Sequence, residues 1–350
     1  MSDTDHAPGD RTVIAASPSR IGWADYARGI AIVLVVYGHC FRGVQGAGLI
    51  PADSVLSSVD YVIYTFHMPL FFFVSGVFSA RTPPLSGRPF WVGRVLGILW
   101  PYLLWMTVEM LLLYALPDIT NAGAFTFGPG NYLFAPISPF WFLYALLFCL
   151  LFVHWLLPWG RLPMLAIACV VFVAGQTATA EIVRLTTWGL LYFALGAGWG
   201  AVVRGQAFAR LVGAPVTLVI CTAGALGFSL ACLRLGIPNQ LAVPAAVFGS
   251  GAVFCLAERL SRLAARVQVL RVISYFGRIS LTVLVVHILG TAAARIVMGP
   301  VLGIRSEALL LLGGTLVGLG VPVALQVVST RLRIAGLLGL PQLAARSAAR

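Results

Sequence analysis

The chain has 350 residues, of which 60% are hydrophobic and only 10% are charged, and its formal net charge is +12. Soluble globular proteins carry about 25% charged residues, so this composition excludes an ordinary soluble enzyme. Apolar runs of 18 or more residues predict transmembrane helices, and positive residues gather on the cytoplasmic side of membrane proteins. The positive net charge is therefore explained by basic residues on the cytoplasmic side of the membrane. We expect membrane lipids as partners and no nucleic acid.

Ten apolar segments follow one another along the chain. They predict an all-α polytopic membrane protein with about ten transmembrane helices, at residues 22–42, 56–80, 94–116, 136–157, 161–179, 185–203, 211–233, 238–257, 279–298 and 307–329. The fifth and sixth of these segments are joined by a short link and are the hardest to separate.

The arginines between the segments predict the orientation. With a cytoplasmic amino terminus, the inner segments hold sixteen arginines and the outer segments hold five. This bias predicts that both termini are cytoplasmic and that the number of spans is even. We therefore expect a disordered cytoplasmic tail at 1–20, a transmembrane domain at 21–330 and a basic cytoplasmic tail at 331–350, the last lying along the inner leaflet.

The first segment contains the sequence DYARGIAIVLVVYGH, in which eleven residues separate Arg28 from His39. Eleven residues make about three turns plus ~20°, so both side chains leave the same face, ~16 Å apart. Asp25 falls within ~40° of that face. Ionisable residues inside a span usually face the protein interior or a wet cavity. One stripe of this helix is therefore expected to face inward and to mark a candidate site.

Two further ionisable groups are predicted at a similar depth in the membrane. His67 lies ~20 Å from the inner end of the second segment, and Glu109 lies ~22 Å beyond Arg94 on the third. Pro69 is expected to kink the second helix beside His67. The alternative is structural: His67 or His287 could each be a hydrogen-bonded core residue, and Glu109 could hold Arg28 or a histidine in place.

Several motifs resemble those of the membrane-bound acyltransferase-3 family. RGIAIVLVVYGH resembles the family's Arg-x10-His signature, and FHMPLFFFVSG resembles its next landmark, particularly in the branch similar to fucose 4-O-acetylases. The sequences WPYLLW at 100–105, FWFLYALL at 140–147 and FGRISLTVLVVH at 276–287 follow in the expected order. The resemblance covers residues 22–330.

The resemblance implies an integral protein of a bacterial cytoplasmic (inner) membrane that transfers an acyl group, usually acetyl, from cytoplasmic acetyl-CoA. The implied acceptor is a sugar hydroxyl of a surface polysaccharide, a lipid-linked oligosaccharide or a related glycan, and polysaccharide biosynthesis machinery is a candidate partner. Arg28 and His39 match the family's essential pair. Many members carry Arg-x-x-Arg before the third span, whereas here Arg94 is followed by Gly97 at the second position.

These residues lead to a set of expected roles. His39 is the candidate base, with Glu109 or His67 orienting it or polarising the carbonyl, and an acyl-histidine intermediate stays open. Guanidinium groups pair with phosphates in bidentate fashion, so the candidate donor-binding residues are Arg28, Arg94, Arg81, Arg88 and Arg278. Candidate acceptor contacts are Asp25, Trp141 and Tyr64. The six cysteines lack metal-ligand spacing, and we expect no metal.

A transporter or flippase is the alternative function. In that case Arg28, His39, Glu109 and His67 would form a proton or substrate relay inside the membrane. The chain has no inverted repeat of the kind that transporters often contain, and this weighs against transport.

Overall fold

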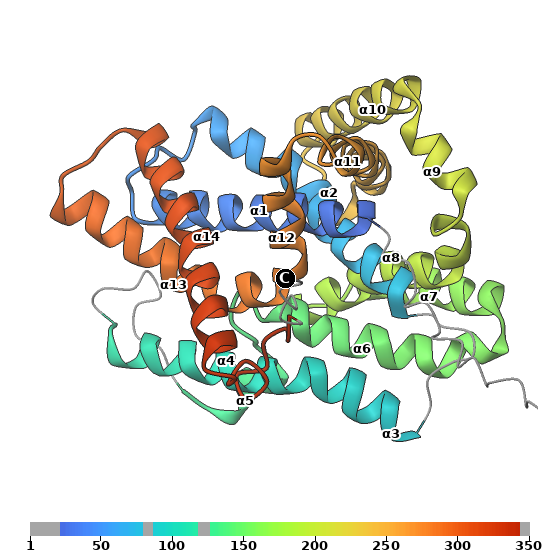
Figure 1. Cartoon of the computed structure of the whole chain (residues 1–350), viewed down its shortest axis with the longest axis horizontal. Helices are drawn as coiled ribbons and strands as arrows, with labels where there is room; N and C mark the ends of the chain where they lie inside the picture. The colour runs from blue at the N-terminus through green and yellow to red at the C-terminus, as the bar shows by residue number, and fades with distance from the viewer. Residues whose placement is uncertain (1–21, 80–86, 118–126, 344–350) are drawn as a thin grey trace, which may run out of the picture.

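The computed structural model describes residues 22–79, 87–117 and 127–343, and all regular elements in these ranges are helices. The predicted tail at 1–20, Arg81 and the last seven residues lie outside the described residues. Residues 22–203 form α1 (Gly22–Gly46), α2 (Val55–Ser79), α3 (Gly87–Phe90), α4 (Leu96–Ala115), α5 (Pro129–Leu133), α6 (Trp141–Leu156), α7 (Arg161–Gly175) and α8 (Glu181–Val203). Residues 206–331 form α9 (Gln206–Gly213), α10 (Pro215–Arg234), α11 (Val243–Leu263), α12 (Arg271–Arg278), α13 (Ser280–Ile296) and α14 (Glu307–Arg331) (Figure 1).

Nine helices within the described ranges are long and apolar enough to cross a membrane. They correspond to nine of the ten predicted segments, and α3 and α4 form one of them through a π-helical stretch at Trp91–Val95. The segment predicted at 161–179 is α7, which ends at Gly175 after 15 residues. Its length is about 22 Å, shorter than a hydrocarbon core of about 30 Å. The prediction of about ten spans thus becomes nine long helices and one shorter one.

The short helix α7 runs antiparallel to α8 along much of its length. At the start of α7 the Arg161 guanidinium lies 5.2 Å from the Trp199 ring centroid, near the end of α8. Just beyond the end of α7 the Gln176 amide donates to the Arg184 carbonyl at 3.2 Å and to the Thr187 hydroxyl at 3.3 Å, near the start of α8. Because α7 reverses the chain direction as a span would, the helices on either side keep the alternation that the arginines predict.

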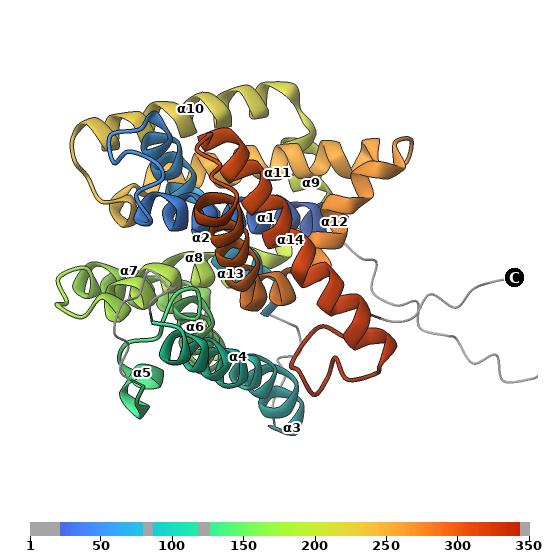
Figure 2. The same cartoon turned by 90° about the vertical axis from the view of Figure 1, so that its left-hand side faces the viewer.

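The helix α1 lies in the middle of the bundle and packs against α2, α11, α12, α13 and α14. Figures 1 and 2 show α10 and α11 on one side of it and α4 and α6 on the other. Gly29 lets α12 approach closely, because an added Cβ there would lie 1.9 Å from the Ile273 carbonyl oxygen. The polar stripe of α1 is therefore enclosed by protein on most sides, as predicted.

Glycines also set the close approach of α2 and α8. A Cβ added at Gly76 would lie 2.0 Å from the Phe193 carbonyl oxygen, and one added at Gly196 would lie 2.0 Å from the Phe73 carbonyl oxygen. Small residues that let backbones approach are a usual basis of helix association in membranes. This contact fixes the position of α2, which carries His67 next to α1.

Residues 332–343, predicted as part of a tail along the inner leaflet, fold back onto α4. The indole N–H groups of Trp100 and Trp105 donate to the carbonyls of Leu337 at 2.8 Å and Leu338 at 2.9 Å. These contacts connect the end of α14 to α4. Sequence patterns do not predict them, because the acceptors are backbone carbonyls that every residue carries.

The substitution Gly196→Ala should lower the temperature of unfolding in detergent, because its Cβ would collide with the backbone of α2. Overpacking of this kind costs about 1–3 kcal/mol. Gly227→Ala on α10 is the matched control, since a Cβ there meets nothing within 4 Å. Thermal unfolding followed by circular dichroism checks the difference, and equal unfolding temperatures for the two variants would contradict the packing.

Candidate active site

His39 opens onto a cavity of about 530 Å³ formed by the ends of α1, α4 and α13 and the segment before α6. Glu109 on α4 lines the same cavity and is only 6% exposed. Its Oε2 is buried and has no hydrogen-bond partner among the described residues. The depth estimates from the sequence thus placed His39 and Glu109 at one level, and the structure brings them to one cavity. We call it the outer cavity, after the side that the arginine distribution predicts.

Two further histidines surround His39. The ring centroid of His287 on α13 lies 5.0 Å from that of His39, in an edge-to-face arrangement. His67 on α2 and Arg42 on α1 lie close enough to act electrostatically on His39. Both neighbouring histidines are almost fully buried, His67 at 2% and His287 at 0% exposure. His39 thus lines the outer cavity with His287 packed against it, and His67 lies within electrostatic range behind them.

A polar chain connects the wall of the outer cavity to His67. Arg42 lines the cavity, and its Nε and Nη2 donate to the two carboxylate oxygens of Asp60, each at 3.0 Å. The guanidinium of Arg42 also lies 3.8 Å from the ring centroid of Tyr64, and the Tyr64 ring lies 4.7 Å from the His67 ring. Tyr64, predicted to contact an acceptor, thus lies behind Arg42 and beside His67.

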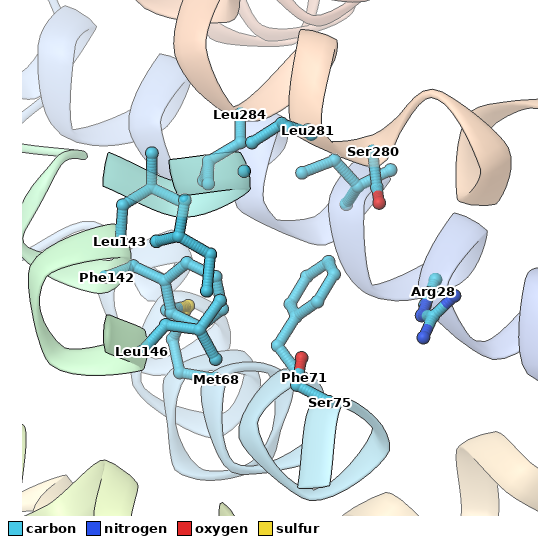
Figure 3. Close-up of a pocket in the computed structure, with 13 residues that line it drawn as sticks. Arg28, Met68, Phe71, Ser75, Phe142, Leu143, Leu146, Ser280, Leu281 and Leu284 are labelled. Carbon is cyan, nitrogen blue, oxygen red and sulfur yellow. The ribbon is translucent and has the colours of Figure 1, made fainter. Parts of the chain in front are cut away.

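Two smaller cavities lie toward the other end of α1. One, of about 200 Å³, is lined mainly by apolar side chains of α1, α2, α4, α6 and α13 (Figure 3). The other has a volume of about 240 Å³. The two cavities adjoin, because they share five lining residues: Arg28, Ser75, Gly97, Ile98 and Leu146. We call the pair the inner cavities.

Gly97 is the position at which the sequence departs from the Arg-x-x-Arg pattern, and it lines both inner cavities. A Cβ added at Gly97 would meet nothing within 4 Å. The backbone of α4 is therefore bare where the inner cavities adjoin, and a larger side chain there has room to project into them.

Two of the predicted donor-binding arginines meet at the inner cavities. Arg28 and Arg94 both line the inner cavity of about 240 Å³. The Arg28 guanidinium lies 4.8 Å from the ring centroid of Phe78, and Arg94 Nη2 donates to the Phe78 carbonyl at 3.1 Å. Arg88 is exposed on α3 and lines neither inner cavity. Arg278 ends α12 and also lines neither.

The structure does not bring Asp25 and Trp141 to His39. Asp25 lies fourteen residues before His39 on the same helix, about 21 Å along the axis, and acts electrostatically on Arg28. Trp141 is 7% exposed and packs against the rings of Phe142 and Trp188. Contacts of Asp25 and Trp141 with an acceptor stay predictions.

From the sequence, His287 was expected only as a core residue or a reactive group, and nothing indicated that Arg42 and Arg295 line a cavity. The signal for His287 was its place at the end of FGRISLTVLVVH, seven residues beyond the start of α13. No pattern marked Arg42 or Arg295, since both counted only as outer arginines at the ends of predicted spans. Within the described ranges no group of three His, Cys, Asp or Glu side chains is gathered as a metal site requires.

Sequence comparisons relate this chain to known proteins. A family profile described as an acyltransferase domain matches residues 21–327. The nodulation protein NolL of Mesorhizobium japonicum (strain LMG 29417 / CECT 9101 / MAFF 303099) is 29% identical over 179 residues, which cover 49% of this chain and 46% of that protein. NolL of Sinorhizobium fredii (strain NBRC 101917 / NGR234) is 28% identical over 216 residues, covering 60% and 55%. The chain thus spans about half the length of the curated relatives it matches, and no solved structure matches it.

The two sets of cavities should be reached from opposite sides of the membrane. We expect Ser75→Cys, at the inner cavities, and Ala292→Cys, at the outer cavity, to react with a membrane-impermeant maleimide from opposite faces of sealed vesicles. Each cysteine is introduced into a variant in which the six native cysteines have been replaced, so that only the new thiol can react. Labelling of both cysteines from one and the same face would contradict the assignment.

Proposed function

Since the chain belongs to the acyltransferase-3 family of integral membrane proteins, we propose that it transfers an acetyl group from cytoplasmic acetyl-CoA to a sugar hydroxyl. The acceptor is a surface polysaccharide, a lipid-linked oligosaccharide or a related glycan, and the protein works in a bacterial cytoplasmic membrane beside polysaccharide biosynthesis machinery. The match of the acyltransferase profile to residues 21–327 supports the reaction class. The acetyl group and the sugar rest on the likeness of FHMPLFFFVSG to the fucose 4-O-acetylase branch.

One observation carries the proposal: a single helix, α1, presents an arginine to the inner cavities and a histidine to the outer cavity. Arg28 and His39 lie ~16 Å apart along the helix axis. If the donor binds at the inner cavities and the acceptor at the outer cavity, one extended donor molecule must reach from Arg28 to His39. The pantetheine arm of coenzyme A is about as long as this rise.

The inner cavities suit the donor. Coenzyme A is polyanionic, and Arg28 and Arg94 both line the inner cavity of about 240 Å³. Arginine stays charged and pairs with phosphate oxygens through two N–H groups at once. Beyond Arg28 the wall becomes apolar, with Phe71, Leu281 and Leu284 among its lining residues, which suits an uncharged arm.

A layer of side chains separates the inner cavities from the outer cavity. The two sets share no lining residue, and Ile32 at the inner cavity precedes His39 at the outer one by seven residues, about 10 Å. Met68 and Leu284 line the inner side of this layer. A methionine side chain is flexible and adapts to a changing neighbour. The arm of the donor would displace these side chains to bring the thioester to His39.

At His39 the chemistry is the attack of a hydroxyl oxygen on the thioester carbonyl. The neutral imidazole accepts the hydroxyl proton as the new C–O bond forms, and the C–S bond then breaks. The leaving thiolate takes the proton, so that free coenzyme A and the ester are the products. Glu109 lines the same cavity, which supports a role for it in orienting the acceptor or the imidazole.

Replacement of His39 by alanine should abolish acyl transfer while the protein still inserts and folds. General bases typically contribute about 100- to 10,000-fold to the rate, so turnover should fall by at least about 100-fold. Release of free coenzyme A from acetyl-CoA by purified protein with glycan acceptors measures the effect. Wild-type turnover in the variant would refute the role of His39. A wild-type protein that moves a glycan across vesicles without consuming thioester would favour transport.

Gly97→Leu should raise the KM for acetyl-CoA more than it lowers kcat, because its side chain would project into the space shared by the inner cavities. When a substitution weakens binding of the substrate and of the transition state equally, KM rises and kcat stays unchanged. Gly227→Leu, where an added Cβ meets nothing within 4 Å, is the control for a glycine replaced within a membrane helix. An unchanged KM for the donor in the Gly97 variant would remove the inner cavities from the donor path.

A further inference from the structure

His287 is the one ring among the three clustered histidines that has both a fixed tautomer and a buried, unpartnered nitrogen within the described residues. Its exposed fraction is 0%. Its Nδ1 lies 2.8 Å from the carbonyl oxygen of Val283 and 2.9 Å from that of Leu284, both on its own helix. Its Nε2 is buried and has no hydrogen-bond partner among the described residues.

These contacts determine where the proton of the neutral ring sits. A carbonyl oxygen only accepts hydrogen bonds, so Nδ1, which faces two carbonyls, must carry the hydrogen and donate it. In a neutral imidazole the other nitrogen then has a lone pair and acts as an acceptor. The backbone of α13 thus holds the Nε2 of His287 as a hydrogen-bond acceptor.

A buried acceptor without a donor is costly, and structures rarely retain one that has no use. The ring beside it is His39, with centroids 5.0 Å apart and the planes inclined at 63°. His67 differs from His287 in its ring neighbour, because the His67 ring packs edge-to-face with Tyr64 and not with His39. Catalytic hydrogen bonds are often long without substrate and tighten in the complex. A rotation of the His39 ring is the movement that would bring one of its N–H groups to the lone pair of His287.

We propose that His287 is a positioning residue, which accepts a hydrogen bond from one ring nitrogen of His39 and so leaves the lone pair of the other nitrogen facing the outer cavity. This inference rests on the proposed function, in which His39 takes the proton of the attacking hydroxyl. An orienting partner of this kind selects the tautomer that can act as a base, and it stabilises the imidazolium that forms.

The test compares four variants in the acetyl-CoA assay: His287→Leu, His287→Gln, His39→Ala and the control His154→Gln. His154 stacks on Phe90, with ring centroids 3.6 Å apart, and lines none of the cavities described above. We expect His287→Leu to lower kcat by at least about 100-fold with little change in the KM for acetyl-CoA, because orientation is lost and donor binding is not. The glutamine variant should recover part of kcat, since its amide can both donate to α13 and accept from His39.

The outcomes separate the two proposals. Wild-type turnover in His39→Ala would overturn the proposed function. An inactive His39→Ala together with kcat within about threefold of wild type in a folded His287→Leu would overturn only the positioning role. If the leucine variant does not fold, solid-state NMR of wild-type protein labelled with ¹⁵N-histidine and loaded with a non-hydrolysable acetyl-CoA analogue decides. A cross peak between the His39 and His287 nitrogens that disappears in His39→Ala supports the hydrogen bond, and its absence overturns it.

Discussion

A polar side chain inside a bilayer must find its partners within the protein, and the centre of this structure follows from that requirement. His67 and His287 each use one ring nitrogen to donate to a carbonyl of their own helix. This leaves the second nitrogen of each ring directed away from its backbone. His39 on α1 packs against the His287 ring and lies within electrostatic range of His67. The packing thus concentrates three imidazoles that no single helix could supply.

The separation of the cavities has a physical benefit as well as a chemical one. An open path from one face of a membrane to the other would let ions and protons leak. Here the inner and outer cavities share no lining residue, and apolar side chains such as Ile32 and Leu284 lie on the inner side of the layer between them. The arm of the proposed donor would pass through this layer only while the donor is bound, so that the acyl group, and not water, reaches the outer cavity.

Much of the architecture could be predicted from the sequence, because hydrophobic length and arginine distribution report directly on the membrane. The shared face of Arg28 and His39 follows from helix geometry, and the common depth of His39 and Glu109 follows from counting residues from the inner ends of the first and third spans. The sequence could not predict which helices are neighbours. The approach of α13 to α1, which brings His287 to His39, depends on contacts between distant segments, as does the return of residues 332–343 to α4. Trp141, an expected acceptor contact, packs on Trp188 in the core, and its contact with an acceptor stays a prediction.

The central claim is that a coenzyme enters between Arg28 and Arg94 and extends along α1 toward His39. A cryo-electron microscopy structure with a non-hydrolysable acetyl-CoA analogue tests it most directly. The account predicts phosphate density beside the two guanidinium groups, an extended arm passing Gly97, and displaced side chains at Met68 and Leu284. Density for the nucleotide at the outer cavity, or an arm that leaves the protein before reaching the layer between the cavities, would contradict it.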